Sequence, residues 1–282
     1  MKLSEMKAIL GSSGIRLTKS LGQNFLHDAH QLRRIADAAE LTKADKVLEI
    51  GPGLGPLTEL LAERAGQVLA IEKDARLVAV LRERYHLDLG GAPGLRVVHD
   101  DALEWLRRSA RDWRDWKLVA NLPYSVASPL LVELAQARLG PQRMVGTLQL
   151  EVARRLMAQA GGPDYGVLTL LVQLNYQPRG WFKIPAGCFF PAPEVDSACV
   201  CLARRPQPLL APEDAPVFAA IVKRSFSQRR KMMRKLLQAD WPAETVDRAF
   251  AGLDPQPLPP QARAETVTLE QFVGLTQLLS AD

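Results

Sequence analysis

The sequence predicts an α/β protein, a doubly wound and mostly parallel sheet followed by a small helical domain. From residue 46 onward, short apolar segments of strand length alternate with segments of helical periodicity, which is typical of βαβ units. A glycine-rich turn at 51–55 joins the first of these strands to the first helix. Beyond the Pro-Gln-Pro segment at 206–208 no strand-like alternation remains. We therefore expect two domains, 1–204 and 205–282.

The predicted elements follow one another in the order that such a sheet requires. An arm that looks ordered is expected at 19–26, and a helix at 31–40 precedes the sheet. The first βαβ unit should consist of a strand at 46–50, a helix at 56–65 and a strand at 67–71. Crossover helices between parallel strands account for the segments that follow. Further strands are predicted at 95–98, 117–120, 144–150, 168–174 and 197–202.

Composition limits the class of protein. The chain has 282 residues, of which 47% are hydrophobic, so it can bury a large core. Its formal net charge of +5 favours an anionic partner. No apolar run reaches the roughly 18 residues of a membrane span, and we expect a cytoplasmic monomer. The three cysteines and four histidines lack the spacing of ligand sets, which predicts no metal.

The Asn-Leu-Pro-Tyr segment at 121–124 is the most informative motif. It could be an ordinary strand that ends in a proline turn, but it lies where the fourth strand of the predicted sheet should end. Ligands of such sheets bind outside the carboxyl ends of the strands. An exocyclic amine of adenine is a poor nucleophile, and Asn121 together with a carbonyl turned by Pro123 could accept its hydrogen bonds. Tyr124 offers a ring for stacking, so the motif predicts methyl transfer onto a planar amine.

The glycine turn predicts a nucleoside-containing cofactor. Gly51 and Gly53 let the backbone approach a ligand closely, and Glu72 lies about 20 residues further on, at the end of the second strand, where a carboxylate binds ribose hydroxyls. The Gly-x-Gly-x-Gly spacing favours S-adenosylmethionine over nicotinamide or flavin cofactors. Asp101 follows the third strand, where it could bind an adenine amino group or cap a helix.

Five segments of the chain resemble the small-subunit rRNA adenine dimethyltransferases. They are Leu-Gly-Gln-Asn-Phe-Leu at 21–26, Glu-Ile-Gly-Pro-Gly-Leu at 49–54, the motif at 121–124, Phe-Phe-Pro-Ala-Pro-Glu-Val-Asp-Ser at 189–197 and Phe-Ser-Gln-Arg-Arg-Lys at 226–231. The resemblance implies a Rossmann-like class I methyltransferase domain and a small C-terminal all-helical domain. It also implies that S-adenosylmethionine is used, without a metal, to convert two adjacent adenosines near the 3′ end of small-subunit (16S) rRNA to N6,N6-dimethyladenosine.

The resemblance also implies roles for single residues. Asn121, Leu122 and Tyr124 would hold the target base. Phe189 would be a second aromatic near it, although an ordinary core phenylalanine is an equal alternative. The cofactor contacts would come from the arm, from the ends of the strands and from the motif, at Gln23, Asn24, Leu26, Gly51, Glu72, Asp101 and Asn121.

A basic run at 223–235 predicts contact with rRNA. It contains no acidic residue and interleaves with apolar residues that could anchor one face of a helix, although a solvated helix face is the alternative. Its cations are Lys223, Arg224, Arg229, Arg230, Lys231, Arg234 and Lys235. Two other functions fit parts of the pattern. One is a large-subunit rRNA adenine methyltransferase of the antibiotic-resistance type, and the other is a mainly non-catalytic ribosome assembly factor.

Overall fold

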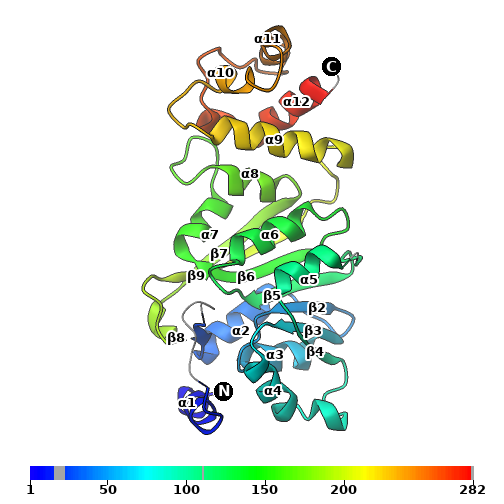
Figure 1. Ribbon diagram of the computed structural model, residues 1–282, viewed down its shortest axis with the longest axis vertical. Coiled ribbons are helices and arrows are strands. Elements are labelled where there is room, and N and C mark those ends of the chain that lie inside the picture. The colour runs from blue at the N-terminus through cyan, green and yellow to red at the C-terminus, as the bar shows by residue number, and fades with distance from the viewer. Residues whose placement is uncertain (16–22, 110, 281–282) are drawn as a thin grey trace. The chain divides into compact units, whose positions relative to one another are not determined.

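The structure is a computed structural model that describes residues 1–15, 23–109 and 111–280 (Figure 1). Contacts divide the chain into two compact units. The first comprises Met1–Ala153 with Pro178–Arg204, and the second comprises Arg154–Gln177 with Arg205–Asp282. The boundary between Arg204 and Arg205 lies where the division into two domains is expected. Residues 154–177 group with the C-terminal helices, because a helix within them packs on the first helix beyond residue 205.

The first unit is built on a seven-stranded sheet in the order β4-β3-β2-β5-β6-β9-β7. Strand β2 pairs in parallel with β3 on one side and with β5 on the other, so the strand order reverses there. In sheets of this kind a ligand crevice forms at the carboxyl ends of the strands beside such a switch point. The strands are β2 (Lys46–Ile50), β3 (Gln67–Glu72), β4 (Leu95–His99), β5 (Trp116–Asn121), β6 (Arg143–Gln149), β7 (Tyr176–Ile184) and β9 (Ser197–Arg204).

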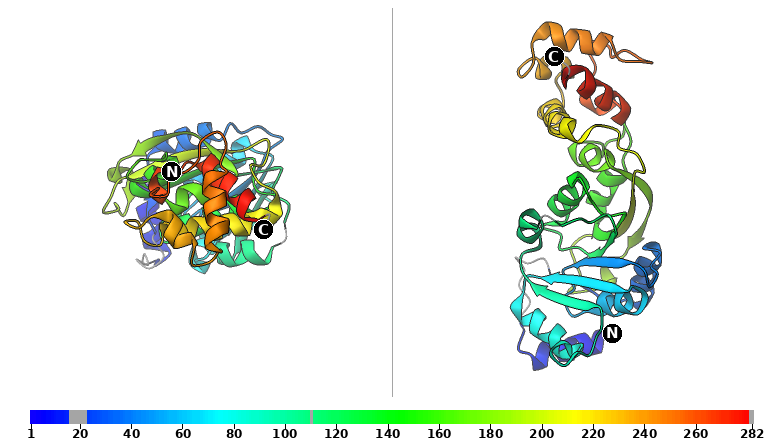
Figure 2. Two further views of the ribbon diagram at one scale, coloured as in Figure 1. Left: turned by 90° about the horizontal axis from the view of Figure 1, so that it is seen from above. Right: turned by 90° about the vertical axis from the view of Figure 1, so that its right-hand side faces the viewer.

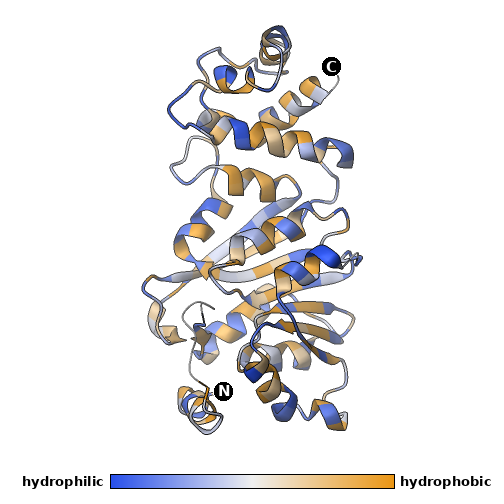
Figure 3. Ribbon diagram, in the orientation of Figure 1, coloured by the Kyte–Doolittle hydropathy of each residue, from blue (hydrophilic) through white to orange (hydrophobic). Residues whose placement is uncertain are grey.

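Helices cover both faces of this sheet. Figures 1 and 2 show α2 (Ala29–Ala38) and α3 (Pro56–Arg64) on one face, with α5 (Ala102–Arg108) and α6 (Ala127–Gln136) on the other. Because both faces are covered, the central strands are apolar almost throughout, as Figure 3 shows along β2 and β3. The remaining helices of this unit are α1 (Leu3–Ser12), α4 (Ala75–Arg84), η2 (Leu87–Leu89), η3 (Ala186–Cys188) and the first half of α7 (Leu150–Met157).

A two-stranded ribbon lies apart from the main sheet. Strand β1 (Phe25–Leu26) pairs antiparallel with β8 (Phe189–Phe190), so that Leu26 lies opposite Phe189. The ribbon joins the end of the N-terminal arm to the segment before β9. Residues 19–22 of the expected arm lie outside the described part of the chain.

The second unit is helical. Tyr165, Phe226 and Phe272 form a row of rings in its core, with centroids 6.1 and 6.2 Å apart. Leu170, Phe218 and Leu275 are buried completely in this unit. Its helices are α8 (Val167–Gln173), η4 (Pro212–Asp214), α9 (Ala215–Phe226), α10 (Met233–Leu237), α11 (Ala243–Ala251), η5 (Ala264–Thr266) and α12 (Leu269–Ser280).

One predicted element is wrong. The segment 168–174 forms helix α8 and not a strand. A short continuous apolar run fits a buried strand and a buried helix equally well by periodicity. Here it is a helix whose residues Thr169, Leu170 and Val172 are buried in the second unit. The seventh strand of the sheet is β7, which was not predicted because Pro178 and Gly180 interrupt its pattern.

Candidate active site

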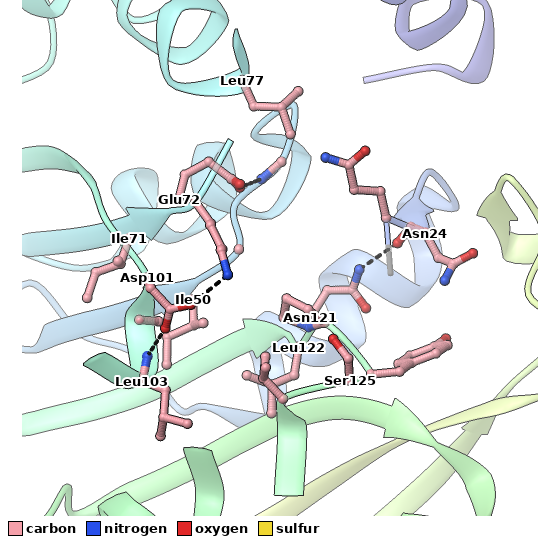
Figure 4. A pocket seen from close by; sticks show the side chains of 18 of the residues that line it. Asn24, Ile50, Ile71, Glu72, Leu77, Asp101, Leu103, Asn121, Leu122 and Ser125 are labelled. Atoms are coloured by element: carbon pink, nitrogen blue, oxygen red, sulfur yellow. Dashed lines mark hydrogen bonds and ion pairs between the residues drawn. The ribbon is translucent and has the colours of Figure 1, made fainter. Parts of the chain in front are cut away.

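A pocket opens at the carboxyl ends of the parallel strands, beside the switch point at β2 (Figure 4). Strands β2, β3 and β5 contribute residues at their ends, residues 100–103 follow the end of β4, and the N-terminal arm closes one side. Seven of the sequence-predicted cofactor residues line it together with three of the base-binding residues, and Asn121 belongs to both groups. They are Gln23, Asn24, Gly51, Gly53, Glu72, Asp101, Asn121, Leu122 and Tyr124.

The glycine turn needs glycine at two positions. Gly51 and Gly53 have φ values of +68° and +61°, which side-chain-bearing residues rarely adopt. A Cβ on Gly53 would lie 2.7 Å from the Phe25 ring. A Cβ on Gly51 would lie 3.1 Å from the Pro123 ring, so the turn also packs on the Asn-Leu-Pro-Tyr motif. The absence of these two side chains brings the turn, the arm and the motif together around one pocket.

Glu72 ties the second strand to this turn. Its carboxylate accepts hydrogen bonds from the backbone N–H of Gly53 (3.1 Å) and of Asp74 (2.9 Å). Burial raises the pKa of Glu72, and these backbone donors oppose the rise. Each carboxylate oxygen has a second lone pair, so Glu72 can still accept hydrogen bonds from a ligand hydroxyl in the pocket.

Asp101 is a helix cap that also lines the pocket. One carboxylate oxygen accepts hydrogen bonds from the N–H groups of Leu103 (2.9 Å) and Glu104 (3.2 Å) at the start of α5. The other oxygen lies 2.8 Å from Nζ of Lys73. This hydrogen bond is the main reason that the pKa of Asp101 is lowered. The capping alternative is therefore correct, and it leaves the charged carboxylate at the pocket wall.

Asn121 presents an unused hydrogen-bond acceptor. Its side-chain N–H donates to the backbone oxygen of Asn24 at 2.9 Å, which fixes the amide plane. Its Oδ1 is buried and has no hydrogen-bond partner among the described residues. A buried polar atom without a partner costs about 1–3 kcal/mol, so such atoms are usually satisfied by something that the protein binds. The amide therefore offers an acceptor for the N–H group of a ligand.

Contacts with the sheet hold Leu122 and Tyr124, the other two predicted base-binding residues of the motif. Leu122 is 1% exposed, and its N–H donates to the Thr147 oxygen at 3.0 Å. The Tyr124 ring lies half-buried at the pocket, where its hydroxyl is 2.5 Å from Oγ of Ser197 at the start of β9. Burial raises the pKa of Tyr124, which keeps the phenol neutral. The ring is thus anchored at its far end and can offer a face to a planar base.

Two predicted contacts do not reach the pocket. Leu26 and Phe189 are 1% and 3% exposed and lie in the core cluster beneath α2 and α3. Their pairing in the β1–β8 ribbon turns both side chains inward, which favours the core interpretation of Phe189. Phe25, which the sequence analysis did not select, lines the pocket instead. Neighbouring residues in a strand face opposite sides, so a strand at 25–26 could have indicated that only one of Phe25 and Leu26 faces the pocket.

A second missed residue holds the arm. Asp74 caps α4, and its carboxylate accepts a hydrogen bond from Nε2 of Gln23 at 3.0 Å. The Arg76 guanidinium, and to a smaller extent Gln23, hold the pKa of Asp74 at about 2. Asp74 therefore stays charged and fixes Gln23 at the pocket wall. The sequence shows Asp74 two residues after Glu72, but nothing in it indicates a contact with position 23.

The predicted RNA-binding cations form no continuous helical face. Helix α9 ends at Phe226 and α10 begins at Met233, so the basic run spans a turn and does not lie on one face of a single helix. Arg224 pairs with Asp240 and Arg234 with Asp247, while Arg229 donates to the backbone oxygens of Pro163 and Tyr165. The cations that are exposed and have no partner among the described residues are Lys223, Arg230, Lys231 and Lys235.

Neither a metal-ligand cluster nor a membrane-spanning helix is present in the described residues. They contain no group of three or more His, Cys, Asp and Glu side chains placed to bind a metal ion. None of the helices in that part of the chain has the length and apolarity needed to cross a bilayer.

Comparison with known proteins gives consistent results. A family model described as Ribosomal RNA adenine dimethylase matches residues 14–276. Ribosomal RNA small subunit methyltransferase A of Geobacillus thermodenitrificans is 39% identical over 97% of this chain and 94% of its own length. The protein of the same name from Streptococcus pneumoniae is 38% identical over 98% of this chain and 96% of its own length.

Two solved structures share the fold. The 23S rRNA methyltransferase ErmE has a TM-score of 0.67 and 31% identity, and the match covers 91% of this chain and all of that one. A dimethyladenosine transferase from Plasmodium falciparum has a TM-score of 0.68 and covers 89% of this chain and 95% of its own. At 24% identity, this second likeness supports the fold alone.

Proposed function

The chain belongs to the ribosomal RNA adenine dimethylase family, and we propose that it dimethylates N6 of two adjacent adenosines near the 3′ end of small-subunit rRNA. The enzyme acts in the biogenesis of the small ribosomal subunit. The observation that carries the proposal is the unpartnered Oδ1 of Asn121 in the strand-end pocket. It supplies an acceptor for an amine N–H where the fold binds its ligands.

The pocket residues fit S-adenosylmethionine as the methyl donor. The backbone at Gly51 and Gly53 leaves room for close approach, and a Cβ at either position would be crowded. Glu72 would accept hydrogen bonds from ribose hydroxyls, and Asp101 from the adenine amino group of the cofactor. Gln23 and Asn24 would close the side formed by the arm. When bound, this cofactor supplies an electrophilic methyl group.

The protein's own contribution to catalysis is positioning. The lone pair of the target N6 is delocalised into the base, so the amine reacts only when it is held in line with the methyl donor. Asn121 would accept an N–H of this amine, and Tyr124 would stack on the ring. The base must leave its stack to enter the pocket. Holding the reacting atoms in a near-attack geometry corresponds to effective molarities of about 10⁵ M or more.

No strong general base is required at N6. Once the methyl group is transferred, the amine is acidic and loses its proton to solvent. The nearby carboxylates have other roles in this proposal, because Glu72 and Asp101, which already accept hydrogen bonds within the protein, would bind the cofactor. The two methylations would use the same residues, with the singly methylated amine held again by Asn121.

The small subunit is favoured over the large one as the substrate. Relatives named for the small subunit are 38 and 39% identical over nearly the whole chain, whereas ErmE, named for 23S rRNA, is 31% identical. The intact cofactor pocket argues against a purely non-catalytic assembly factor, because binding to rRNA alone needs no such pocket. We also infer that the protein is a monomer.

The test is methyl transfer to two substrates in parallel. Purified protein is incubated with S-adenosylmethionine labelled in the methyl group and with under-methylated small subunits, or with large-subunit rRNA. We expect label in the small-subunit RNA only. Label confined to large-subunit RNA would move the assignment to the resistance-type enzymes. Tight binding to small subunits without transfer of a methyl group would support the alternative function, a non-catalytic assembly factor.

A further inference from the structure

A groove lies on the first unit at the open edge of its sheet, away from the pocket described above. Strand β7 is the last strand in the order, so one of its edges is unpaired in the described structure. The groove lies between this strand, the neighbouring β9 and the end of α2. Its walls include Glu40, Arg143, Arg179, Trp181, Phe182 and Cys201.

Trp181 is the most unusual residue of this groove. It is 47% exposed, and it is one of four large apolar side chains that are exposed in the described residues. Next to it, Gly180 has a φ of +141°, and no atom lies within 4 Å of where its Cβ would be. The strand therefore presents an indole ring beside open backbone, a surface on which a planar group can stack.

Two arginines line the groove together with Trp181. Arg179 is exposed and has no hydrogen-bond or ion-pair partner among the described residues. It lies close enough to Cys201 to lower the pKa of that thiol, although burial raises it overall. Arg143 is held by the Ala38 oxygen at 2.9 Å and by Glu40 at 2.5 Å. Behind them, the Arg34 guanidinium stacks 3.8 Å from the centroid of the Phe182 ring. The walls of the groove thus hold two guanidinium groups, of Arg179 and Arg143, and one carboxylate, that of Glu40.

We propose that this groove binds unpaired nucleotides of the rRNA, with a base stacked on Trp181 and the neighbouring phosphate on Arg179. A cationic groove with an exposed aromatic ring is the usual surface for single-stranded nucleic acid. This inference rests on the proposed function, and it adds a second RNA-binding site on the methyltransferase unit. It is separate from the exposed cations of the helical unit.

A protein strand paired with β7 is the rival occupant. The strand is poorly built for it, because Pro178 has no N–H to donate and Gly180 departs from strand geometry. Charge also favours RNA, since the groove has an excess of cations. The exposed indole and the unpaired guanidinium are accounted for by a base and a phosphate.

The test measures binding of protein-free, unmodified small-subunit rRNA at several salt concentrations. Trp181→Ala should weaken binding about tenfold, since a stacked base contributes about 1–3 kcal/mol. Arg179→Ala should lower the slope of log K against log salt by about 0.7, the value for one phosphate contact on a single strand. Matched controls are Arg96→Ala, an exposed arginine on β4 at the opposite edge of the sheet, and Leu89→Ala, which removes another exposed apolar side chain.

The controls should bind as the wild type does. Trp181→Ala and Arg179→Ala proteins that also do so would overturn the inference, and methyl transfer by the wild type would then leave the proposed function standing. Weaker binding of assembled subunits with unchanged binding of free rRNA would also overturn it, because the partner would then be a ribosomal protein. A wild type that transfers no methyl group contradicts the proposed function instead.

Discussion

At the scale of single residues, Asn121 combines a fixed donor with a free acceptor. The hydrogen bond from its side chain to Asn24 holds the amide, so that Oδ1 remains available to the pocket. Asn121→Ala should therefore lower kcat at least about 100-fold, because the target amine loses the group that orients it.

The fold should survive this change, since Asn121 is only partly buried. Single-turnover methylation measures the effect, with circular dichroism and the thermal midpoint as controls. Turnover close to the wild-type value in a folded variant would contradict the role given to Asn121.

Glu49 provides a second prediction, on stability. Its side chain on β2 is 1% exposed, and burial raises its pKa to about 8, helped by the charge of Glu72 and opposed by the Thr58 hydroxyl. The folded state therefore holds a proton that the unfolded state releases above its pKa of 4.5. Between about pH 4.5 and 8 the wild type should lose stability as the pH rises, by at most about 1.4 kcal/mol per pH unit from this group.

Glu49→Gln removes the titration and keeps the shape of the side chain. Its free energy of unfolding, relative to that of the wild type, should rise across this pH window. Urea unfolding at several pH values measures this difference, from which the shared contribution of all other groups cancels. A difference that stays constant from pH 5 to 8 would show that Glu49 is ionised throughout.

At the scale of elements, the glycine turn depends on space as well as on backbone angles. Gly53→Ala should weaken binding of S-adenosylhomocysteine strongly, because the added Cβ would lie 2.7 Å from the Phe25 ring at the pocket wall. Gly90→Ala is the matched control, since Gly90 also has a positive φ, +74°, but has no atom within 4 Å.

Both variants bear the same kind of backbone strain, so a difference between them shows that positive φ alone does not account for the loss at Gly53. Isothermal titration calorimetry should show a loss of affinity for Gly53→Ala only. Equal affinities would mean that the turn and the arm can move apart without consequence for the ligand.

Several strands could be predicted from the sequence because local signals mark where they begin and end. The strands β2, β3 and β5 begin and end within one residue of their predicted bounds, because polar residues and glycines bracket short apolar runs. The segment 168–174 was misassigned because a buried helix and a buried strand have the same composition over seven residues. Strand β7 was not predicted, because its pairing within the sheet overrides the poor strand propensity of Pro178 and Gly180.

At the scale of the whole molecule, binding of rRNA should depend on the cations that the protein does not use itself. Arg230→Ala with Lys231→Ala should lower the slope of log K against log salt by about 1.5, because both side chains are exposed and unpaired in the described structure. Arg224→Ala with Arg234→Ala is the comparison, since these side chains pair with Asp240 and Asp247.

The second pair should change the slope less and the thermal midpoint more. Filter binding to small-subunit rRNA gives the slopes, and thermal unfolding gives the midpoints. Identical slopes for the wild type and the double variant Arg230→Ala with Lys231→Ala would show that these two side chains do not contact the RNA.

Most of the site could be predicted from the sequence, because its residues follow strand ends at spacings that the fold imposes. Gly51, Glu72, Asp101 and Asn121 come together for this reason. The rest depended on contacts between distant segments. The pairing of β1 with β8 turns Leu26 and Phe189 into the core and Phe25 toward the pocket, and the acidic partners of Arg224 and Arg234 lie beyond the basic run.

The most direct measurement is the identity and position of the methylated nucleosides. After reaction with S-adenosylmethionine, small-subunit rRNA is digested and its fragments are sequenced by mass spectrometry. We predict N6,N6-dimethyladenosine at two adjacent positions near the 3′ end, and none in the same reaction with Asn121→Ala. Methylation at a single adenosine, on another base, or only in large-subunit rRNA would contradict the proposed function.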